Sequence, residues 1–332
     1  MPELPEVETV RLGLARLLPG RVVSSIMVHE SPKSFPNADS DVNQFLVGAT
    51  VQSIDRRGKA LIVELSSGYS LFIHLKMTGQ LVFVGGGVEE QPARPLAGRT
   101  KNEGKQQKHT NAKLSKISDP SSKIQNMDEV RFGAGHPNES LVGPLPDRST
   151  RVTIAFTDGS HLYFNDQRKF GWIKLLPSEL VAEEPFMKNL GPEPLEPEFT
   201  HQQFIERVRR RAKTNIKAAL LDQSVLAGVG NIYADESLWG AKIHPSELVG
   251  SITDARLKKL HEELLYVLKL SIEKGGSTDK NYVNAEGKRG SYLKFARVFR
   301  REKLPCPRCG TIIEKSKVAG RGTHTCPSCQ KL

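Results

Sequence analysis

Apolar residues at the start of the chain recur with the spacing of a helix. They predict one amphipathic helix over residues 5–18, with Pro5 in its first turn and Pro19-Gly20 ending it. The apolar stripe consists of Val7, Val10, Leu14 and Leu17. Burial of this stripe against a core would fix the first residues of the chain in space.

The pattern then changes to short runs typical of β-strands. The clearest runs are 60–65, 69–75, 79–84, 151–156 and 161–164. Ser67-Gly68 and Asp158-Gly159 have the composition of hairpin turns. Strands at this spacing predict an antiparallel sandwich rather than alternating strands and helices.

Residues 85–148 interrupt the strand pattern. They contain few large apolar side chains and many lysines, so they bury too little surface to order themselves. We therefore expect at least 85–125 to be flexible. A basic loop can touch nucleic acid, but this composition favours a solvated, non-essential insertion.

Helical patterns dominate the second half of the chain. Pro192, Pro194 and Pro197 mark a linker that precedes them. The helical patterns cover 200–211, 214–223, 231–239 and 254–274. The last of these carries a leucine-rich face and ends at Gly275-Gly276, a typical helix stop.

Length and charge narrow the class of protein. A chain of 332 residues holds two ordinary domains and a small appendage. A net charge of +11 favours a polyanionic partner, although only modestly, because many basic proteins have solvated surfaces. No apolar run of about 18 residues is present, which excludes a membrane span. The acidic start lacks the features of a secretory signal, so we expect a cytosolic, reducing location.

The cysteines give the most specific spacing signal. All four lie near the C-terminus, as Cys306-x2-Cys309 and Cys326-x2-Cys329. Such paired knuckles are typical of a tetrahedral zinc site with four thiolate ligands, whereas four unrelated thiols would not be spaced in this way. Because no coordination position is left for water, we expect one structural Zn²⁺.

A basic stretch and a glycine-rich turn indicate anion binding. Arginines and lysines follow Glu206 without an intervening acid as far as Lys217, and Gly228-Val229-Gly230-Asn231 then joins two predicted helices. Glycines let backbone N–H groups approach a phosphate, and a helix N-terminus favours an anion. Such a turn alone is weak, but beside the basic stretch phosphate binding is the better interpretation.

The N-terminus offers a nucleophile. Removal of Met1 would leave Pro2 with a secondary amine, whose pKa of about 8 keeps a useful fraction neutral. Glu3 and Glu6 place carboxylates beside it for acid–base work. From composition alone, a flexible terminus near acidic residues is the simpler explanation.

Several strings, in order, resemble bacterial formamidopyrimidine-DNA glycosylase. They are MPELPEVETV at the start, RRGK at 56–59, HLKMTG at 74–79, DQRKFG at 166–171, LGPEPL at 190–195, GVGNIYADE at 228–236 and the final CPRC and CPSCQK. The resemblance covers almost the whole chain outside 85–148.

The resemblance implies an α+β, multidomain fold. An N-terminal helix and an antiparallel β-sandwich would form a catalytic domain over 1–185, with 85–148 inserted, and 186–199 would be a linker. A helix–two-turn–helix domain would cover 200–300, and a β-hairpin zinc finger with four cysteines would cover 301–332.

The implied activity is excision of oxidised purines from double-stranded DNA in base-excision repair, followed by strand cleavage through β,δ-elimination. The lesions would be 8-oxoguanine and formamidopyrimidines. Pro2 would be the Schiff-base nucleophile and Glu3 the acid that protonates the opening sugar. Lys59 matches a lysine assigned to β-elimination, and Arg321 an arginine assigned to phosphate grip and δ-elimination.

Further matches imply DNA contacts. His74 and Asn231 match phosphate contacts. Met77, Arg168 and Phe170 match the trio that fills the space of a flipped base; by pattern alone, core packing would explain Met77 and Phe170, and a solvated charge Lys59. The positions matched near the DNA or the damaged base are Lys213, Lys217 and Glu236.

Two departures from the family pattern concern DNA and lesion contacts. Ser149 stands where the family commonly places a DNA-contacting histidine. Arg300 replaces a customary glycine beside the region that covers the flipped base.

Two other functions remain open. An endonuclease VIII-type enzyme would act on oxidised pyrimidines, although Leu4 in PELPE favours the purine branch. A catalytically inactive zinc-finger DNA-binding protein is disfavoured by the intact Pro2, Glu3 and Lys59. We further expect a monomer without membrane contact, associated with the nucleoid of the bacterial cytoplasm.

Overall fold

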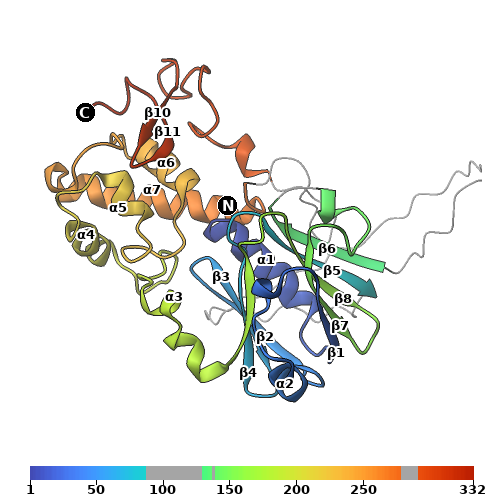
Figure 1. The fold of residues 1–332 in the computed structure, drawn as a ribbon. Coiled ribbons are helices and arrows are strands. Elements are labelled where there is room, and N and C mark those ends of the chain that lie inside the picture. Colours follow the sequence, from blue (N-terminus) through green and yellow to red (C-terminus); the bar gives the residue numbers. More distant parts are fainter. Residues whose placement is uncertain (87–128, 137–138, 278–290) are drawn as a thin grey trace, which may run out of the picture.

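The computed structural model describes residues 1–86, 129–136, 139–277 and 291–332 (Figure 1). The chain begins with α1 (Leu4–Leu17), which agrees with the predicted helix. Two antiparallel sheets follow. One has the order β1 (Val23–Val28), β7 (Thr150–Phe156), β8 (His161–Asp166), β5 (Gly79–Gly86) and β6 (Glu129–Gly135). The other has the order β2 (Val51–Arg57), β3 (Ala60–Leu65), β4 (Tyr69–His74) and β9 (Trp172–Pro177).

The two sheets and α1 share one apolar core, which confirms the predicted sandwich. Val7, Val10 and Leu14 of α1 are fully buried in it, together with alternate residues of the strands such as Leu61 and Phe83. The short helices α2 (Asp39–Asp41) and α3 (Pro185–Lys188) lie outside these sheets. Burial of the α1 stripe therefore anchors the N-terminus, as the apolar spacing predicted.

Four longer helices form a second core. They are α4 (His201–Arg209), α5 (Ile216–Leu221), α6 (Asn231–Gly240) and α7 (Asp254–Glu273). The helix α7 ends where Gly275 adopts a positive φ, as predicted. After it, β10 (Glu314–Val318) and β11 (Arg321–Thr325) pair as an antiparallel hairpin.

The expectation of a flexible stretch over 85–125 was wrong at its first two residues, and a strand in the remainder of the segment 85–148 was not predicted. Gly85 and Gly86 continue β5, and β6 pairs with β5 as the edge strand of its sheet. Phe132 and Ala134 of β6 face the core and are almost fully buried. Glycines between these apolar residues weakened the strand pattern in the sequence. The rest of the predicted flexible stretch, 87–125, lies outside the described residues.

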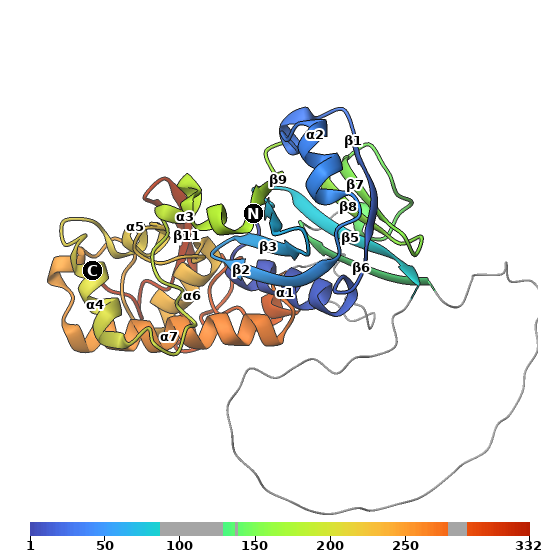
Figure 2. The same cartoon turned by 90° about the horizontal axis from the view of Figure 1, so that it is seen from below.

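The N-terminus lies where the sandwich meets the helices. Figures 1 and 2 show α1 between the sheets and α7, and α1 contacts β2, β6 and α7. Glu193, in the predicted linker, accepts hydrogen bonds from Arg56 at 2.7 Å and Arg57 at 3.2 Å, which ties the linker to the β2–β3 hairpin.

Among the described helices, none combines the length and apolar character that a bilayer crossing requires.

Candidate active site

A cavity of about 600 Å³ opens at this junction, and residues distant in the sequence line it. They include Pro2, Glu3, Glu6, Lys59, Met77, Asn231 and Arg321. Pro2, Glu3, Glu6 and Lys59 are buried, whereas Arg321 is exposed. The fold thus brings a chain-start proline, carboxyl groups and cationic side chains into one cavity, as predicted for the N-terminus.

Glycines in the turn before α6 make room for the chain start. The backbone N–H of Leu4 donates to the carbonyl of Gly228 at 3.0 Å. A Cβ on Gly228, which has a φ of +80°, would lie 2.7 Å from the Leu4 side chain, and one on Gly230 would lie 2.1 Å from the Glu3 carboxyl carbon. Close approach of the N-terminus, rather than phosphate binding alone, therefore explains this glycine-rich turn.

Glu3 has the environment of a proton donor. Burial raises its pKa to about 7, despite the opposing effect of the nearby Lys59 charge. One carboxyl oxygen accepts from the backbone N–H of Ile232 at 3.2 Å, and the other, Oε2, has no hydrogen-bond partner in the described part of the chain. At neutral pH a large fraction of Glu3 therefore carries a proton that is available to a ligand.

Glu6 holds the surroundings of the chain start. It accepts hydrogen bonds from the Glu3 backbone N–H at 2.9 Å, the Tyr233 hydroxyl at 2.6 Å and the Ser277 backbone N–H at 2.8 Å. These three donors come from different parts of the chain, so Glu6 links α1 to α6 and to the segment after α7. Tyr233 was not predicted as a partner of Glu6, because no local pattern around Tyr233 indicates a contact with α1.

Burial lowers the pKa of both amines in the cavity. Burial lowers the pKa of the Met1 amino group, although Glu3 and Glu6 act against this effect. Burial likewise lowers the pKa of Lys59, whose Nζ donates to the carbonyl of Val229 at 3.0 Å. An amine with a lowered pKa has a larger neutral, nucleophilic fraction at physiological pH.

A buried aspartate shapes the loop that carries Arg168 and Phe170. Asp166, fully buried at the end of β8, accepts from the backbone N–H groups of Arg168 at 3.1 Å and of Phe170 at 2.8 Å, and also from the Thr78 hydroxyl. The Phe170 ring is 54% exposed, and the Arg168 guanidinium lies 4.9 Å from its centroid. Core packing of Phe170 is thereby excluded.

The predicted phosphate contacts occupy different settings. Asn231, at the start of α6, donates to the carbonyl of Gly322 at 3.0 Å, beside Arg321 in the hairpin. His74 is buried and lies outside the cavity lining; burial lowers its pKa to about 3, so its ring is neutral at physiological pH. Its Nδ1 accepts from the Lys76 backbone N–H at 2.9 Å.

Lys217, which was predicted to lie near the DNA or the damaged base, is buried. Its Nζ donates to Asp235 at 2.6 Å, to the Thr323 hydroxyl at 2.8 Å and to the Gly322 carbonyl at 3.1 Å, and neither Lys217 nor Asp235 is exposed. These bonds dock the hairpin that carries Arg321 onto α5 and α6. Lys213 is exposed in the loop between α4 and α5.

Glu236 is also fully buried, so it holds the backbone instead of facing a ligand. Its carboxylate accepts from the backbone N–H groups of Arg297 at 2.9 Å, Val298 at 2.9 Å and Phe299 at 2.8 Å. This segment leads directly into the cavity lining at Phe299 and Arg300.

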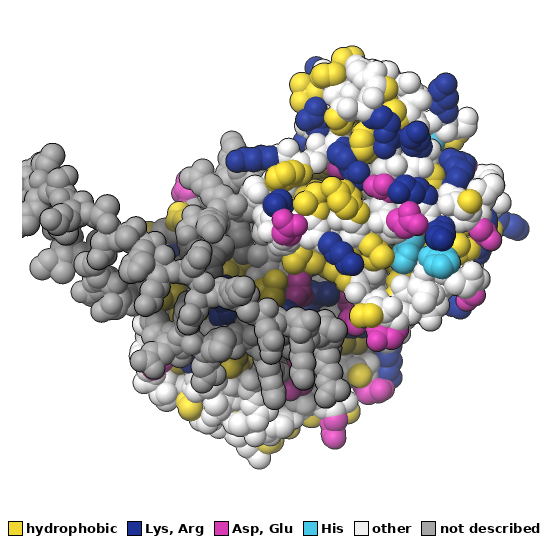
Figure 3. Space-filling view, turned by 180° about the vertical axis from the view of Figure 1, so that it is seen from behind, with side chains coloured by type: hydrophobic (Ala, Val, Ile, Leu, Met, Phe, Trp, Pro, Cys, Tyr) yellow, Lys and Arg dark blue, Asp and Glu magenta, His cyan; other side chains and the backbone are white. Residues whose placement is uncertain are grey.

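The four cysteines converge as predicted. The Sγ atoms of Cys306, Cys309, Cys326 and Cys329 all lie within 4.8 Å of one another. Tetrahedral zinc with bonds of about 2.3 Å to sulfur requires thiolates about 3.8 Å apart, so the cluster fits one structural zinc ion. The hairpin closed by this cluster presents Arg321 to the cavity. Lys and Arg side chains are spread over the hairpin and the adjoining helices on the face seen in Figure 3.

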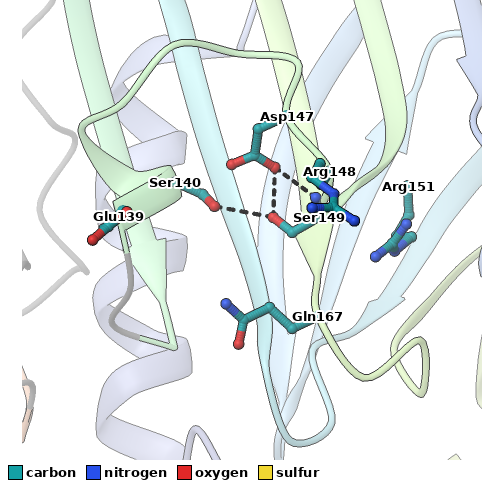
Figure 4. A pocket seen from close by; sticks show the side chains of 7 residues that line it. All are labelled: Glu139, Ser140, Asp147, Arg148, Ser149, Arg151 and Gln167. Carbon is teal, nitrogen blue, oxygen red and sulfur yellow. Dashed lines mark hydrogen bonds between the residues drawn. The ribbon is translucent and has the colours of Figure 1, made fainter.

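A second cavity, of about 660 Å³, surrounds Ser149 (Figure 4). The Ser149 hydroxyl donates to Asp147 at 2.7 Å and lies 3.0 Å from the Ser140 hydroxyl. Arg151, in the same wall, donates to the carbonyl of Asp166 at 2.8 Å and so abuts the loop with Arg168. The described residues that line this cavity include no amine nucleophile, whereas those of the first cavity include the chain start and Lys59.

Comparisons with known proteins agree along the whole chain. Family models match residues 1–135 (formamidopyrimidine-DNA glycosylase N-terminal domain), 190–282 (its H2TH domain) and 303–332 (a zinc finger found in FPG and IleRS). Formamidopyrimidine-DNA glycosylase of Pediococcus pentosaceus is 36% identical over 332 residues, covering all of both chains.

Solved structures match equally well. A Lactococcus lactis FPG mutant in complex with Fapy-dG containing DNA aligns with a TM-score of 0.76 and 31% identity over all of both chains. A structure of MutM in complex with carbocyclic 8-oxo-G containing DNA aligns with a TM-score of 0.75 and 31% identity, again over all of both chains.

Proposed function

The chain belongs to the formamidopyrimidine-DNA glycosylase family, and from this premise we propose that it excises oxidised purines through a Schiff base on Pro2. It is a DNA glycosylase for oxidised purines in base-excision repair, with the DNA-(apurinic or apyrimidinic site) lyase activity of its family. The observation that carries the residue assignment is the cavity in which Pro2, Glu3 and Lys59 meet Arg321.

Removal of Met1 exposes the nucleophile. Glu3 donates a proton to O4′ of the extruded nucleotide, and the lone pair of the Pro2 nitrogen forms a bond to C1′ as the C1′–O4′ bond breaks. The new ammonium loses its proton, and its lone pair then forms the C1′–nitrogen double bond as the base leaves with the electrons of the glycosidic bond. The product is an iminium ion between Pro2 and C1′. Glu6, held by three donors, positions the chain start.

Strand cleavage follows from the iminium. It acidifies the C2′ proton, and loss of that proton expels the 3′ phosphate in β-elimination; a second elimination expels the 5′ phosphate. Lys59 is a proton acceptor of lowered pKa inside the cavity. Arg321 at the exposed mouth binds phosphate oxygens, and Asn231, in the same cavity lining, binds the same phosphodiester backbone. We assign to His74, which is buried outside that lining, a further phosphate contact.

When the damaged base leaves the duplex, side chains of the enzyme must fill the space that it vacates. Met77 in the cavity wall and the exposed Phe170 supply apolar surface, and Arg168 supplies hydrogen-bond donors for the orphaned partner base. Lys217 and Glu236 position the hairpin and the cavity wall, while the exposed Lys213 faces phosphates.

The partner is double-stranded DNA that contains oxidised bases. We assign catalysis to 1–185, DNA binding to 200–300 and the zinc finger to 301–332, with 186–199 as the linker. The enzyme acts as a monomer on the nucleoid in the bacterial cytoplasm.

Borohydride trapping tests the assignment. Full-length enzyme is incubated with duplexes that contain 8-oxoguanine opposite each normal base, with thymine glycol duplex as the comparison. We expect a covalent adduct with 8-oxoguanine that maps to Pro2 by mass spectrometry and is absent from Pro2→Gly. A DNA shift without an adduct would indicate an inactive binder, and faster excision of thymine glycol would indicate an endonuclease VIII-type enzyme.

A further inference from the structure

Arg300 lies in the wall of the active-site cavity with a backbone conformation that side chains with a Cβ rarely adopt. Its φ is +55°, in the left-handed region that favours glycine. Such strain persists only where the surroundings fix it, and it is concentrated at functional sites. The chain accepts this steric cost at a position where glycine would have none.

The residues before Arg300 form a rigid base for it. Three backbone N–H groups over 297–299 donate to the buried Glu236 carboxylate. The Phe299 ring packs edge-on against His324 of β11, with centroids 5.1 Å apart. The Arg300 guanidinium lies 5.8 Å from the centroid of the Phe299 ring. The backbone that leads into Arg300 is therefore held by a buried carboxylate, and the Arg300 side chain lies beside the Phe299 ring.

Exposure places Arg300 at the mouth of the cavity. Arg300 and Arg321 are exposed, whereas Glu3 and Lys59 are buried deeper in the same cavity. A nucleotide that enters base first leaves its phosphodiester groups at the mouth. Phosphate oxygens are the acceptors that a guanidinium binds best, in a two-pronged geometry that an ammonium group does not reproduce.

We propose that Arg300 is a further DNA-contacting residue that binds a backbone phosphate beside the extruded nucleotide, together with Arg321. The contact rests on the proposed function, because it requires a nucleotide in the cavity. It offsets the strain at Arg300 only in the DNA complex, so its contribution is to substrate binding and not to folding.

Arg300→Gly separates these two effects. We expect its melting temperature to be unchanged or raised by about 2–4 °C, because glycine relieves the strain. Affinity should fall about tenfold for a duplex with a tetrahydrofuran abasic analogue, which lacks a base and cannot be cleaved. The slope of log affinity against log salt should decrease in magnitude by about one. Arg300→Lys is the matched control, which keeps the charge and most of the slope.

Each other outcome overturns the proposal. Unchanged affinity and salt slope would show that Arg300 makes no phosphate contact. A loss confined to 8-oxoguanine duplex, with tetrahydrofuran duplex bound normally, would assign the contact to the base. A lower melting temperature with unchanged affinity would assign Arg300 to folding. Failure of the wild-type enzyme to form the borohydride adduct would instead refute the proposed function.

Discussion

The carboxyl group of Glu3 accepts a hydrogen bond at 3.2 Å from the backbone N–H of Ile232, the second residue of α6. The acid at the start of the sandwich is thus oriented by the helical part of the chain. The raised pKa of Glu3 also depends on the contact between the chain start and the helical part, because burial is its largest cause. The active site exists only when both parts are assembled.

Glu3→Gln should block base excision and leave DNA binding intact. The amide keeps the acceptor oxygen for Ile232 but cannot donate an acidic proton, so we expect single-turnover excision of 8-oxoguanine to slow by about 100-fold or more. Cleavage of a preformed abasic site should decline less, because its sugar already opens spontaneously. Wild-type excision by this variant would contradict the role of Glu3.

The pKa of Glu3 also makes a pH prediction. Excision requires the protonated acid, so its rate should fall as pH rises through about 7. The folded state holds this proton more tightly than the unfolded state, so the stabilisation is complete below pH 4.5 and is lost as pH rises through about 7. Relative to wild type, Glu3→Gln should gain up to about 3 kcal/mol in free energy of unfolding between those limits. A pH-independent difference in urea titrations would contradict the raised pKa.

Local patterns predicted the elements better than the partners of single residues. The stripe through Val7 and Val10 predicted α1, because the apolar residues on the buried face of a helix recur at a regular spacing in the sequence. The spacing of the cysteines likewise predicted the cluster around Cys306. In the sequence, Lys217 belongs to a basic stretch. In the structure it is buried, and it pairs with Asp235 on another helix. Long-range pairing of this kind leaves no periodic signal in the sequence.

The same limit explains the aspartate at the end of β8. Asp166 holds the backbone that presents Arg168 and Phe170, yet nothing local distinguishes it from a turn aspartate. Its four donors come from the loop and from Thr78, and they become apparent only when the sheet is formed.

The buried Lys217–Asp235 pair should stabilise the docking of the hairpin. Lys217→Met leaves a buried carboxylate without its cation, so we expect a loss of about 3–5 kcal/mol in free energy of unfolding. The double variant Lys217→Met/Asp235→Leu should recover part of it, because neither charge is then left unpaired. Urea unfolding measures this cycle. Unchanged stability of Lys217→Met, with a smaller salt slope of DNA binding, would instead support a direct DNA contact.

Loss of one thiolate should remove the zinc and weaken DNA binding. Cys309→Ser breaks the cluster that closes the hairpin carrying Arg321. We expect bound zinc, measured by elemental analysis, to fall from one per chain to almost none, and affinity for lesion duplex to fall with it. Ser316→Ala, at an exposed position on β10, is the matched control. Normal affinity of a metal-free protein would contradict a role for the hairpin in DNA binding.

Phe170 provides a test of base extrusion that is separate from folding. Its ring is 54% exposed, so Phe170→Ala should change the free energy of unfolding by no more than about 0.5 kcal/mol. Without the ring, the gap left in the duplex is no longer filled, and we expect excision from duplex DNA to slow by about tenfold. Single-stranded DNA with the same lesion has no stack to repair, so its slower processing should not change. Phe170→Trp, which keeps an aromatic wedge, should retain most of the duplex activity. Equal losses on the two substrates would mean that Phe170 acts on the chemistry or on the fold, and not on the extruded base.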